Sequence, residues 1–159
     1  MTRPSGHAGP AVSTPGAQCP GVHRFRFAIA PRGTPPRADA LFTVSCAFVL
    51  PPRIATAVNP AGESPARASL LTVGAEGGGI VLSAVKKADD RDAVIVRVFN
   101  PDSATSRIHL SLTRGLNDAF LVDLLERRQE KVAIDAGSAI VDVGPAQIRT
   151  IELVPDTLG

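Results

Sequence analysis

The sequence predicts an all-β fold, an antiparallel β-sandwich with one short helix. The first observation is that short apolar stretches recur from about residue 80 onward, separated by turn signals every ~8–12 residues. The second is period-two alternation within these stretches, since Ile108, Leu110 and Leu112 alternate with polar residues. Successive short strands joined by turns are typical of a sandwich and argue against an α/β fold.

A Pro- and Gly-rich arm or loop opens the chain over residues 1–22, where repeated prolines remove backbone donors and prevent a lasting helix or central strand. The sandwich is expected to occupy residues 23–159. A strand is predicted at its start, because Phe25, Phe27 and Ile29 fall on one face of an alternating stretch. Burial of a phenylalanine ring contributes about 1.5–3 kcal/mol, so the two rings are predicted to lie in the core.

The remaining elements are one helix and a series of short strands. Residues 37–49 carry apolar side chains at nearly helical spacing and predict the helix, although the valines in this segment also suit a strand. A connector rich in Pro, Ala and Gly follows over residues 51–67. Strands are predicted over residues 70–73, 80–85, 93–99, 108–112, 119–125, 132–134, 139–143 and 148–154. The ring of Phe99, at the end of the third of these strands, is predicted to lie in the core. A turn is predicted at Arg127–Arg128, after the fifth strand.

Composition and charge exclude several classes of protein. The chain has 159 residues, of which 44% are apolar and 20% are charged, and its formal net charge is +2. These values are ordinary for a globular domain and unlike those of a basic nucleic-acid binder. The longest apolar stretch, residues 38–50, is too short to cross a bilayer, and no signal peptide is recognisable. We therefore expect a cytoplasmic chain with neither nucleic acid nor a membrane as its partner.

The two cysteines, Cys19 and Cys46, match no zinc motif in their spacing, because a closed structural zinc site needs four ligands. They are expected to be free thiols, of the kind that pack as small hydrophobes. A disulfide between them would require an oxidising compartment and suitable Cβ geometry, and the sequence leaves that pairing open.

Three segments of the chain follow one another in the order found in one enzyme family. In the hairpin over residues 80–101 the matching positions are Ser83, Ala84, Lys86, Asp92, Val96, Arg97, Asn100 and Pro101. Near the end they are Leu124, Leu125, Glu126, Pro145, Ile148, Arg149, Thr150 and Leu153, and upstream they are Gly21, His23, Phe25, Phe27 and Pro31. The chain resembles the carboxy-terminal β-domain of the bacterial family 38 glycoside hydrolases, the α-mannosidases. It departs from their pattern at Ala146, where a Phe is usual.

The resemblance implies that this chain holds the end of such an enzyme without its catalytic barrel. Retaining hydrolysis uses one carboxyl group as nucleophile and one as acid/base, and the family adds a zinc ion held in that barrel. In this chain His7, His23 and His109 are isolated in sequence, whereas a zinc site needs at least three convergent ligands. We therefore expect no catalytic residue, metal or cofactor in this chain, zinc in the missing barrel, and that barrel as the partner, in cis or in trans.

Other motifs that could carry chemistry have simpler interpretations. Asp89, Asp90 and Asp92 lie in the predicted hairpin turn and lack the Gly and the bidentate Glu of an EF-hand calcium loop, so a solvated turn is predicted. No Gly-x-Ser-x-Gly elbow surrounds a serine, which argues against a serine hydrolase. The run Gly77-Gly78-Gly79 lacks the Lys of a phosphate-binding loop and is interpreted as a flexible tether.

The resemblance also implies a contribution to substrate binding in the intact enzyme. The opening segment is similar to a loop through which the family's β-region approaches the cleft of the barrel, where an arginine contacts sugar. Arg3 is the residue carried over, as a donor to sugar hydroxyls, with His7 and Gln18 as weaker neighbours. The alternative interpretation is a frayed terminus that contacts nothing.

The function predicted from these observations is that of an accessory domain that braces the barrel of an α-mannosidase-like enzyme and lines its cleft. The alternative is a non-catalytic β-domain that binds carbohydrate or another protein. The chain has no Trp, no Tyr and only 6 Phe, which counts against autonomous sugar binding because aromatic rings usually form the platform for a sugar. An exposed polar groove would favour the alternative, whereas an exposed apolar surface would favour the accessory domain.

Overall fold

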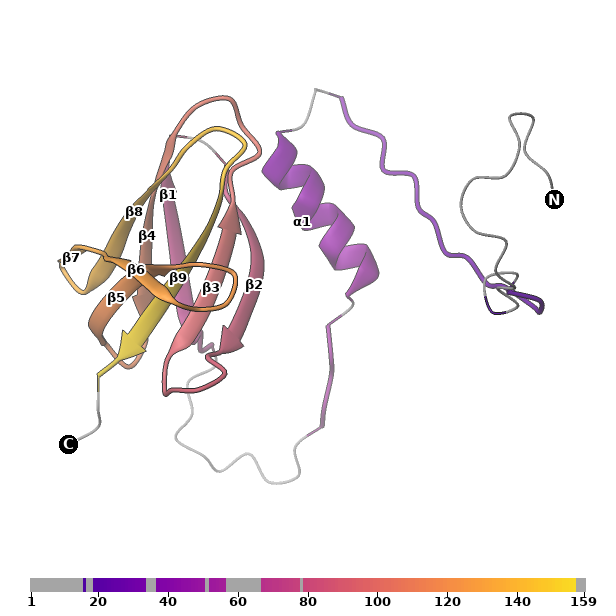
Figure 1. The fold of residues 1–159 in the computed structure, drawn as a ribbon. Coiled ribbons are helices and arrows are strands. Elements are labelled where there is room, and N and C mark those ends of the chain that lie inside the picture. The colour runs from indigo at the N-terminus through magenta and orange to yellow at the C-terminus, as the bar shows by residue number, and fades with distance from the viewer. Residues whose placement is uncertain are drawn as a thin grey trace, which may run out of the picture. The chain divides into compact units, whose positions relative to one another are not determined.

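A computed structural model describes residues 16, 19–33, 37–50, 52–56, 67–77 and 79–156, and it divides the chain into two compact units, Met1–Pro31 and Arg32–Gly159. Figure 1 shows the chain with its helix and strands labelled.

The strand predicted over residues 24–29 is wrong. The first unit has neither helix nor strand in residues 21–31, and no described strand pairs with this segment. The exposed fractions of Phe25, Phe27 and Ile29 are 84%, 85% and 87%, so their predicted place in the core is wrong as well. Alternation marks a strand only where a neighbouring strand supplies hydrogen bonds and covers one face.

The helix predicted over residues 37–49 is confirmed as α1, Ala38–Val49. Its last turn is closed by the amide of Leu50, which donates to the carbonyl of Cys46 at 2.7 Å. No residue of this helix is buried. None of the helices that the structure describes has the length and apolar character needed to cross a bilayer. Cys19 and Cys46 are free thiols, as the sequence predicted, but both are exposed rather than packed as hydrophobes.

The rest of the second unit is an antiparallel β-sandwich, which confirms the predicted fold class (Figure 1). One sheet has the order β1-β4-β8-β7, and its strands are Leu71–Glu76, Ser106–Leu112, Ser138–Val143 and Ile134–Asp135. The other has the order β2-β3-β9-β5-β6, and its strands are Val81–Lys87, Val94–Phe99, Ile148–Pro155, Leu116–Val122 and Arg128–Lys131. Every described pair of strands is antiparallel.

The predicted strands correspond to described ones except between β5 and β8. The strand predicted over residues 132–134 and the turn predicted at Arg127–Arg128 are both wrong, because β6 begins at Arg128 and β7 begins at Ile134. Every residue of β6 is exposed, so this strand has no apolar alternation by which the sequence could reveal it. Between β6 and β7 the chain passes from one sheet to the other, and Val132 is buried in the core at this crossing.

Aliphatic side chains from both sheets form the core. The largest members without measurable exposure are Val96, Val98, Ile108, Leu110, Val143, Ile151 and Leu153. Each such side chain contributes about 1.5–3 kcal/mol when it leaves water. Phe99, which was predicted for the core, is only half-buried at the end of β3. Small and medium aliphatic residues therefore fill the space between the sheets in place of the predicted aromatic rings.

Candidate functional site

A fully buried carboxylate lies on the outer face of the five-stranded sheet. Ile151 and Leu153 of β9 point into the core, so Glu152 between them points to the other side. Its Oε2 accepts a hydrogen bond from Nη2 of Arg91 at 2.7 Å, and its Oε1 accepts one from Nη2 of Arg128 at 2.6 Å. Removing a carboxylate from water costs several kcal/mol unless such pairing compensates. The two arginines are therefore what allows Glu152 to be buried.

The electrostatics keep Glu152 ionised. Burial by itself acts to raise the pKa of this carboxyl, but hydrogen bonds from Arg91 and Arg128 outweigh it, so the pKa lies below its usual value. The same hydrogen bonds raise the pKa of both guanidinium groups. In addition, the guanidinium carbon of Arg128 lies 4.0 Å from the centre of the Phe120 ring, in a cation–π contact. The face of the Phe120 ring is thus already covered.

A second buried carboxylate, Glu126, joins the β2–β3 turn to the β5–β6 turn. Its Oε1 lies 2.7 Å from Nζ of Lys86, and its Oε2 accepts a hydrogen bond from the amide of Asp89 at 3.0 Å. Its backbone carbonyl accepts one from Nη2 of Arg91 at 2.5 Å. Since Arg91 also binds Glu152, the two carboxylates and their cations form one network, which we call the charge network: Lys86, Arg91, Glu126, Arg128 and Glu152.

The solvated turn predicted at Asp89, Asp90 and Asp92 is confirmed. The hairpin closes through the amide of Ala88, which donates to the carbonyl of Ala93 at 2.9 Å. The side chains of the three aspartates are 78%, 74% and 92% exposed. Within the described residues, no group of three or more His, Cys, Asp or Glu side chains could hold a metal ion.

The β5–β6 turn, residues 123–127, is held by hydrogen bonds within the turn and by the contacts of Glu126 with the β2–β3 hairpin. Oδ1 of Asp123 accepts hydrogen bonds from the amides of Leu125 and Arg127 at 2.8 and 2.9 Å, which is the local geometry that favours Asp in turns. Glu126 adopts a left-handed backbone with φ of 62°, which costs a non-glycine residue roughly 1–2 kcal/mol. The hydrogen bonds of its carboxylate within the charge network offset that cost.

This fixed turn presents apolar side chains to solvent. Leu124 is 73% exposed and Leu125 is 70% exposed. Val122 pairs with Thr150, so the turn that follows lies next to the start of β9, where Ile148 is 59% exposed. A hollow of about 380 Å³ is lined by Leu124, Ile148, Arg149 and neighbouring residues. We call Leu124, Leu125, Ile148 and Arg149 the apolar edge.

Arg149 is the polar member of the apolar edge. It precedes the core residue Ile151 by two positions in β9, so it shares the inward orientation of that residue, near the start of the strand. Its Nε is buried and has no hydrogen-bond partner. Within the described part of the chain, no acidic side chain forms an ion pair with Arg149. The Nε donor of Arg149 is therefore unsatisfied in the folded sandwich.

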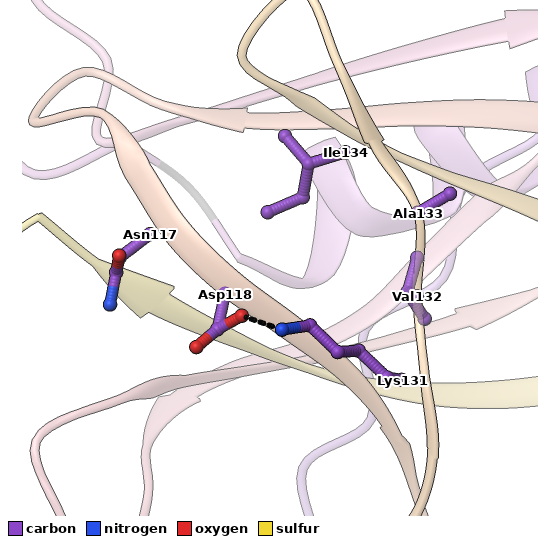
Figure 2. Close-up of a pocket in the computed structure, with 6 residues that line it drawn as sticks. All are labelled: Asn117, Asp118, Lys131, Val132, Ala133 and Ile134. Carbon is purple, nitrogen blue, oxygen red and sulfur yellow. Dashed lines mark ion pairs between the residues drawn. The ribbon is translucent and has the colours of Figure 1, made fainter.

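A second hollow, of about 450 Å³, lies beside β5 and β6 and is open to solvent (Figure 2). Its lining residues are Asn117, Asp118, Lys131, Val132, Ala133 and Ile134. Figure 2 shows Asp118 and Lys131 pointing toward each other, and their charged atoms are 2.6 Å apart. The two charged groups of this hollow thus satisfy each other, and no aromatic ring lines it.

The substrate-binding residues predicted from the sequence, Arg3, His7 and Gln18, lie outside the described residues. Of the other histidines, His23 contacts the carbonyl of Cys19 and His109 contacts Glu76, so each has a local partner. Sequence reasoning missed the role of Glu152. One signal could have revealed it: a glutamate that stands between apolar residues in the middle of a strand, as Glu152 does between Ile151 and Leu153, requires a cation beside it if it is buried.

The described sandwich is therefore an antiparallel β-domain with a buried charge network and an exposed apolar edge. Residues 79–151 match the family model described as glycosyl hydrolases family 38 C-terminal beta sandwich domain. This part of the chain, from the residue before Ile80 to the middle of β9, is similar to that domain. A comparison with curated proteins finds no match.

Proposed function

We propose that this chain serves as the carboxy-terminal accessory domain of an α-mannosidase-like glycoside hydrolase, where it braces the catalytic barrel and lines its cleft. The observation that carries the proposal is the family match over residues 79–151, which spans β2 to β8 and half of β9. In this account zinc, nucleophile and acid/base all belong to the barrel.

The chemistry of the buried carboxylates supports an accessory role. Glycoside hydrolysis needs a carboxylic acid that exchanges a proton and a second carboxylate beside the sugar. Glu152 suits neither task, because its pKa is lowered by its two arginines and its side chain is inaccessible. Glu126 is also buried, and both of its oxygens already accept hydrogen bonds from Lys86 and from the amide of Asp89. We therefore expect the chain alone to be inactive on α-mannosides.

The surface of the sandwich also supports docking over sugar binding. A binding module for carbohydrate needs an exposed ring on which the sugar can stack. In the sandwich, Phe120 is covered by Arg128 and Phe99 is half-buried. The apolar edge, in contrast, exposes three large aliphatic side chains on a fixed turn and its neighbouring strand. Exposed apolar groups that gather at one place are typical of protein contacts.

The proposal is tested by size-exclusion chromatography of the full chain mixed with a family 38 catalytic barrel that lacks its own carboxy-terminal sandwich. We expect the two to elute together as a 1:1 complex. Albumin at the same concentration serves as the control for unspecific association. Separate elution at micromolar concentrations, with both proteins folded by circular dichroism, would contradict the proposal.

A further inference from the structure

We propose that α1 is a hinged cover of the sandwich core, which closes over the side between the edge strands β1 and β2. Its first turn is held at the loop that joins these two strands, and the rest of the helix turns about that point onto apolar side chains that the strands leave exposed. This inference goes beyond the proposed function and does not depend on it. Three features support it: exposed core-facing side chains, the anchored first turn and the pattern of exposure along α1.

The first argument is that the core is open along this side. Leu82 of β2 pairs with Val98, and residues paired in this way share one face of the sheet. Val85 pairs with Val96 in the same manner. Both partners in β3 are 0% exposed, whereas Leu82 is 45% and Val85 is 42% exposed. Solvent therefore reaches core-facing side chains at the edge strand β2.

The edge strand β1 of the other sheet borders the same opening. A hollow of about 540 Å³ is lined by residues of both strands and of the start of α1, namely Arg37, Asp39, Val73, Ala75, Gly79, Ile80 and Leu82. Further along the two strands, Leu70 and Val85 line another hollow, of about 400 Å³. We call the large apolar residues of these two hollows that belong to β1, β2 and their flanks the open seam: Leu70, Val73, Ile80, Leu82 and Val85.

The second argument is that α1 begins at one end of the open seam and is held there. Oδ2 of Asp102 accepts a hydrogen bond from the amide of Gly79 at 2.9 Å and lies 3.9 Å from Nη2 of Arg37, the residue before α1. A Cβ at position 79 would collide with the carboxylate of Asp39 in the first turn, so glycine is what permits this close approach. The 12 residues of α1 span about 18 Å and the 7 residues of β2 about 23 Å, so the helix can cover most of the seam from this anchor.

The third argument is the pattern of exposure along α1. Val44 and Phe48 are four positions apart, so they share one face of the helix, and both are half-buried. Phe42 and Val49 lie on the opposite face and are 45% and 67% exposed. The only charged residue of α1 is Asp39, in the anchored turn. Closure would therefore remove apolar surface of the helix and of the open seam from water without burying a further charge, which favours the closed position.

The first test is a disulfide that requires the closed position, introduced into the full chain with Cys19→Ser and Cys46→Ser. Val44 lies about 7.5 Å along the helix from Asp39, and Leu82 lies about 10 Å along the strand from Gly79, so the two become neighbours on closure. We expect Val44→Cys/Leu82→Cys to form an intramolecular disulfide under mild oxidation, since the Cα atoms must come within about 7 Å. The control Phe42→Cys/Leu82→Cys, on the opposite helix face, should form it at least about tenfold more slowly.

The second test measures how fast a water-soluble reagent modifies the single thiol of Leu82→Cys in the same cysteine-free chain. We expect Val44→Ser/Phe48→Ser to accelerate the reaction about tenfold, because a cover that is closed for about nine-tenths of the time leaves the thiol accessible for the rest. The matched control Phe42→Ser/Val49→Ser removes the same two kinds of side chain from the opposite face and should change the rate less than about twofold. Circular dichroism of each variant excludes loss of fold.

The outcomes decide the inference without reference to the barrel. Equal disulfide formation by the two cysteine pairs, or equal acceleration by the two serine variants, would show that this face of α1 does not close over the open seam. A Val44→Cys/Leu82→Cys disulfide that joins two chains at micromolar concentration would make a second copy the cover and would also overturn the inference. Each of these results leaves the proposed function as it stands, because none of the measurements involves binding to the barrel.

Discussion

Nη2 of Arg91 lies 2.7 Å from Oε2 of Glu152, and this contact joins a hairpin turn to a strand 61 residues further along the chain. The same nitrogen donates to the backbone carbonyl of Glu126. One guanidinium group thus fastens the β2–β3 turn and the β5–β6 turn to the outer face of the sheet. The stability of the sandwich and the conformation of its apolar edge are therefore expected to depend on the same few charges.

Replacing Glu152 by Gln should destabilise the sandwich strongly. The substitution removes the buried acceptor of charged hydrogen bonds from Arg91 and Arg128, whose side chains are 27% and 46% exposed, and each such bond contributes about 1.5–3 kcal/mol. The measurement is the free energy of unfolding in urea. The control is Asp142→Asn, which breaks the exposed pair with Arg107 and should cost at most about 1 kcal/mol. Equal losses in the two variants would contradict the importance assigned to Glu152.

The contribution of Glu152 to the free energy of unfolding should disappear in acid. Its pKa is lowered from 4.5 in the folded chain, because hydrogen bonds from the two arginines outweigh the effect of burial. The unfolded state therefore takes up a proton at higher pH than the folded state does, and the stabilisation is present above pH 4.5 and is lost as the pH falls through the lower folded value. We expect the difference in unfolding free energy between the wild type and Glu152→Gln to be constant near neutrality and to shrink below pH 4.5. A difference independent of pH across that range would show that Glu152 has the same pKa in the folded and unfolded states, which would contradict the lowered pKa.

The left-handed backbone of Glu126 predicts an unusual ranking of two substitutions. Ala and Gly both remove the carboxylate and its hydrogen bonds, but only Gly relieves the strain at φ of 62°. Glu126→Gly should therefore be about 1 kcal/mol more stable than Glu126→Ala. The control is Ala133→Gly, at a position without positive φ, where glycine should lower stability instead. If Glu126→Ala proved the more stable of the pair, the described turn would be incorrect.

Asp123→Ala should loosen the β5–β6 turn without unfolding the sandwich. The substitution removes the acceptor of the amides of Leu125 and Arg127, and each lost hydrogen bond costs about 1 kcal/mol. Amide hydrogen exchange should accelerate at these two residues and remain slow at core positions such as Ile151. Unchanged exchange at both amides would show that Asp123 does not hold the turn. The control is Asp135→Ala, an exposed position in β7, which should leave exchange in the β5–β6 turn as it is.

Much of the sandwich could be predicted from the sequence because its strands are short apolar stretches separated by turn residues, with clear alternation in β4. The hairpin of β2 and β3 joins two apolar runs by an acidic turn, and both signals are local. The strand predicted near Phe25 failed because the same local alternation has no described partner strand. The strand β6 was missed for the opposite reason, since its charged residues are stabilised by pairing with β5 rather than by burial.

The candidate site was less predictable because it depends on contacts distant in sequence. Arg91 and Glu152 are brought together only when the β2–β3 turn folds over β9, and their separation of 61 residues leaves no local signal of the pairing. Leu124, Leu125 and Glu126 were singled out by the family resemblance alone. Their exposure and the left-handed conformation of Glu126 became evident only with the structure.

The central claim is that this chain completes an α-mannosidase-like enzyme whose chemistry belongs to another part. The most direct measurement is hydrolysis of a chromogenic α-mannoside, with zinc added, by the full chain alone, by a family 38 barrel that lacks its own sandwich, and by the two together. We predict no hydrolysis by the chain alone and a higher rate or longer lifetime of activity for the barrel when the chain is present. Hydrolysis by the chain alone would contradict the account, and so would a barrel whose rate and lifetime are the same with and without the chain.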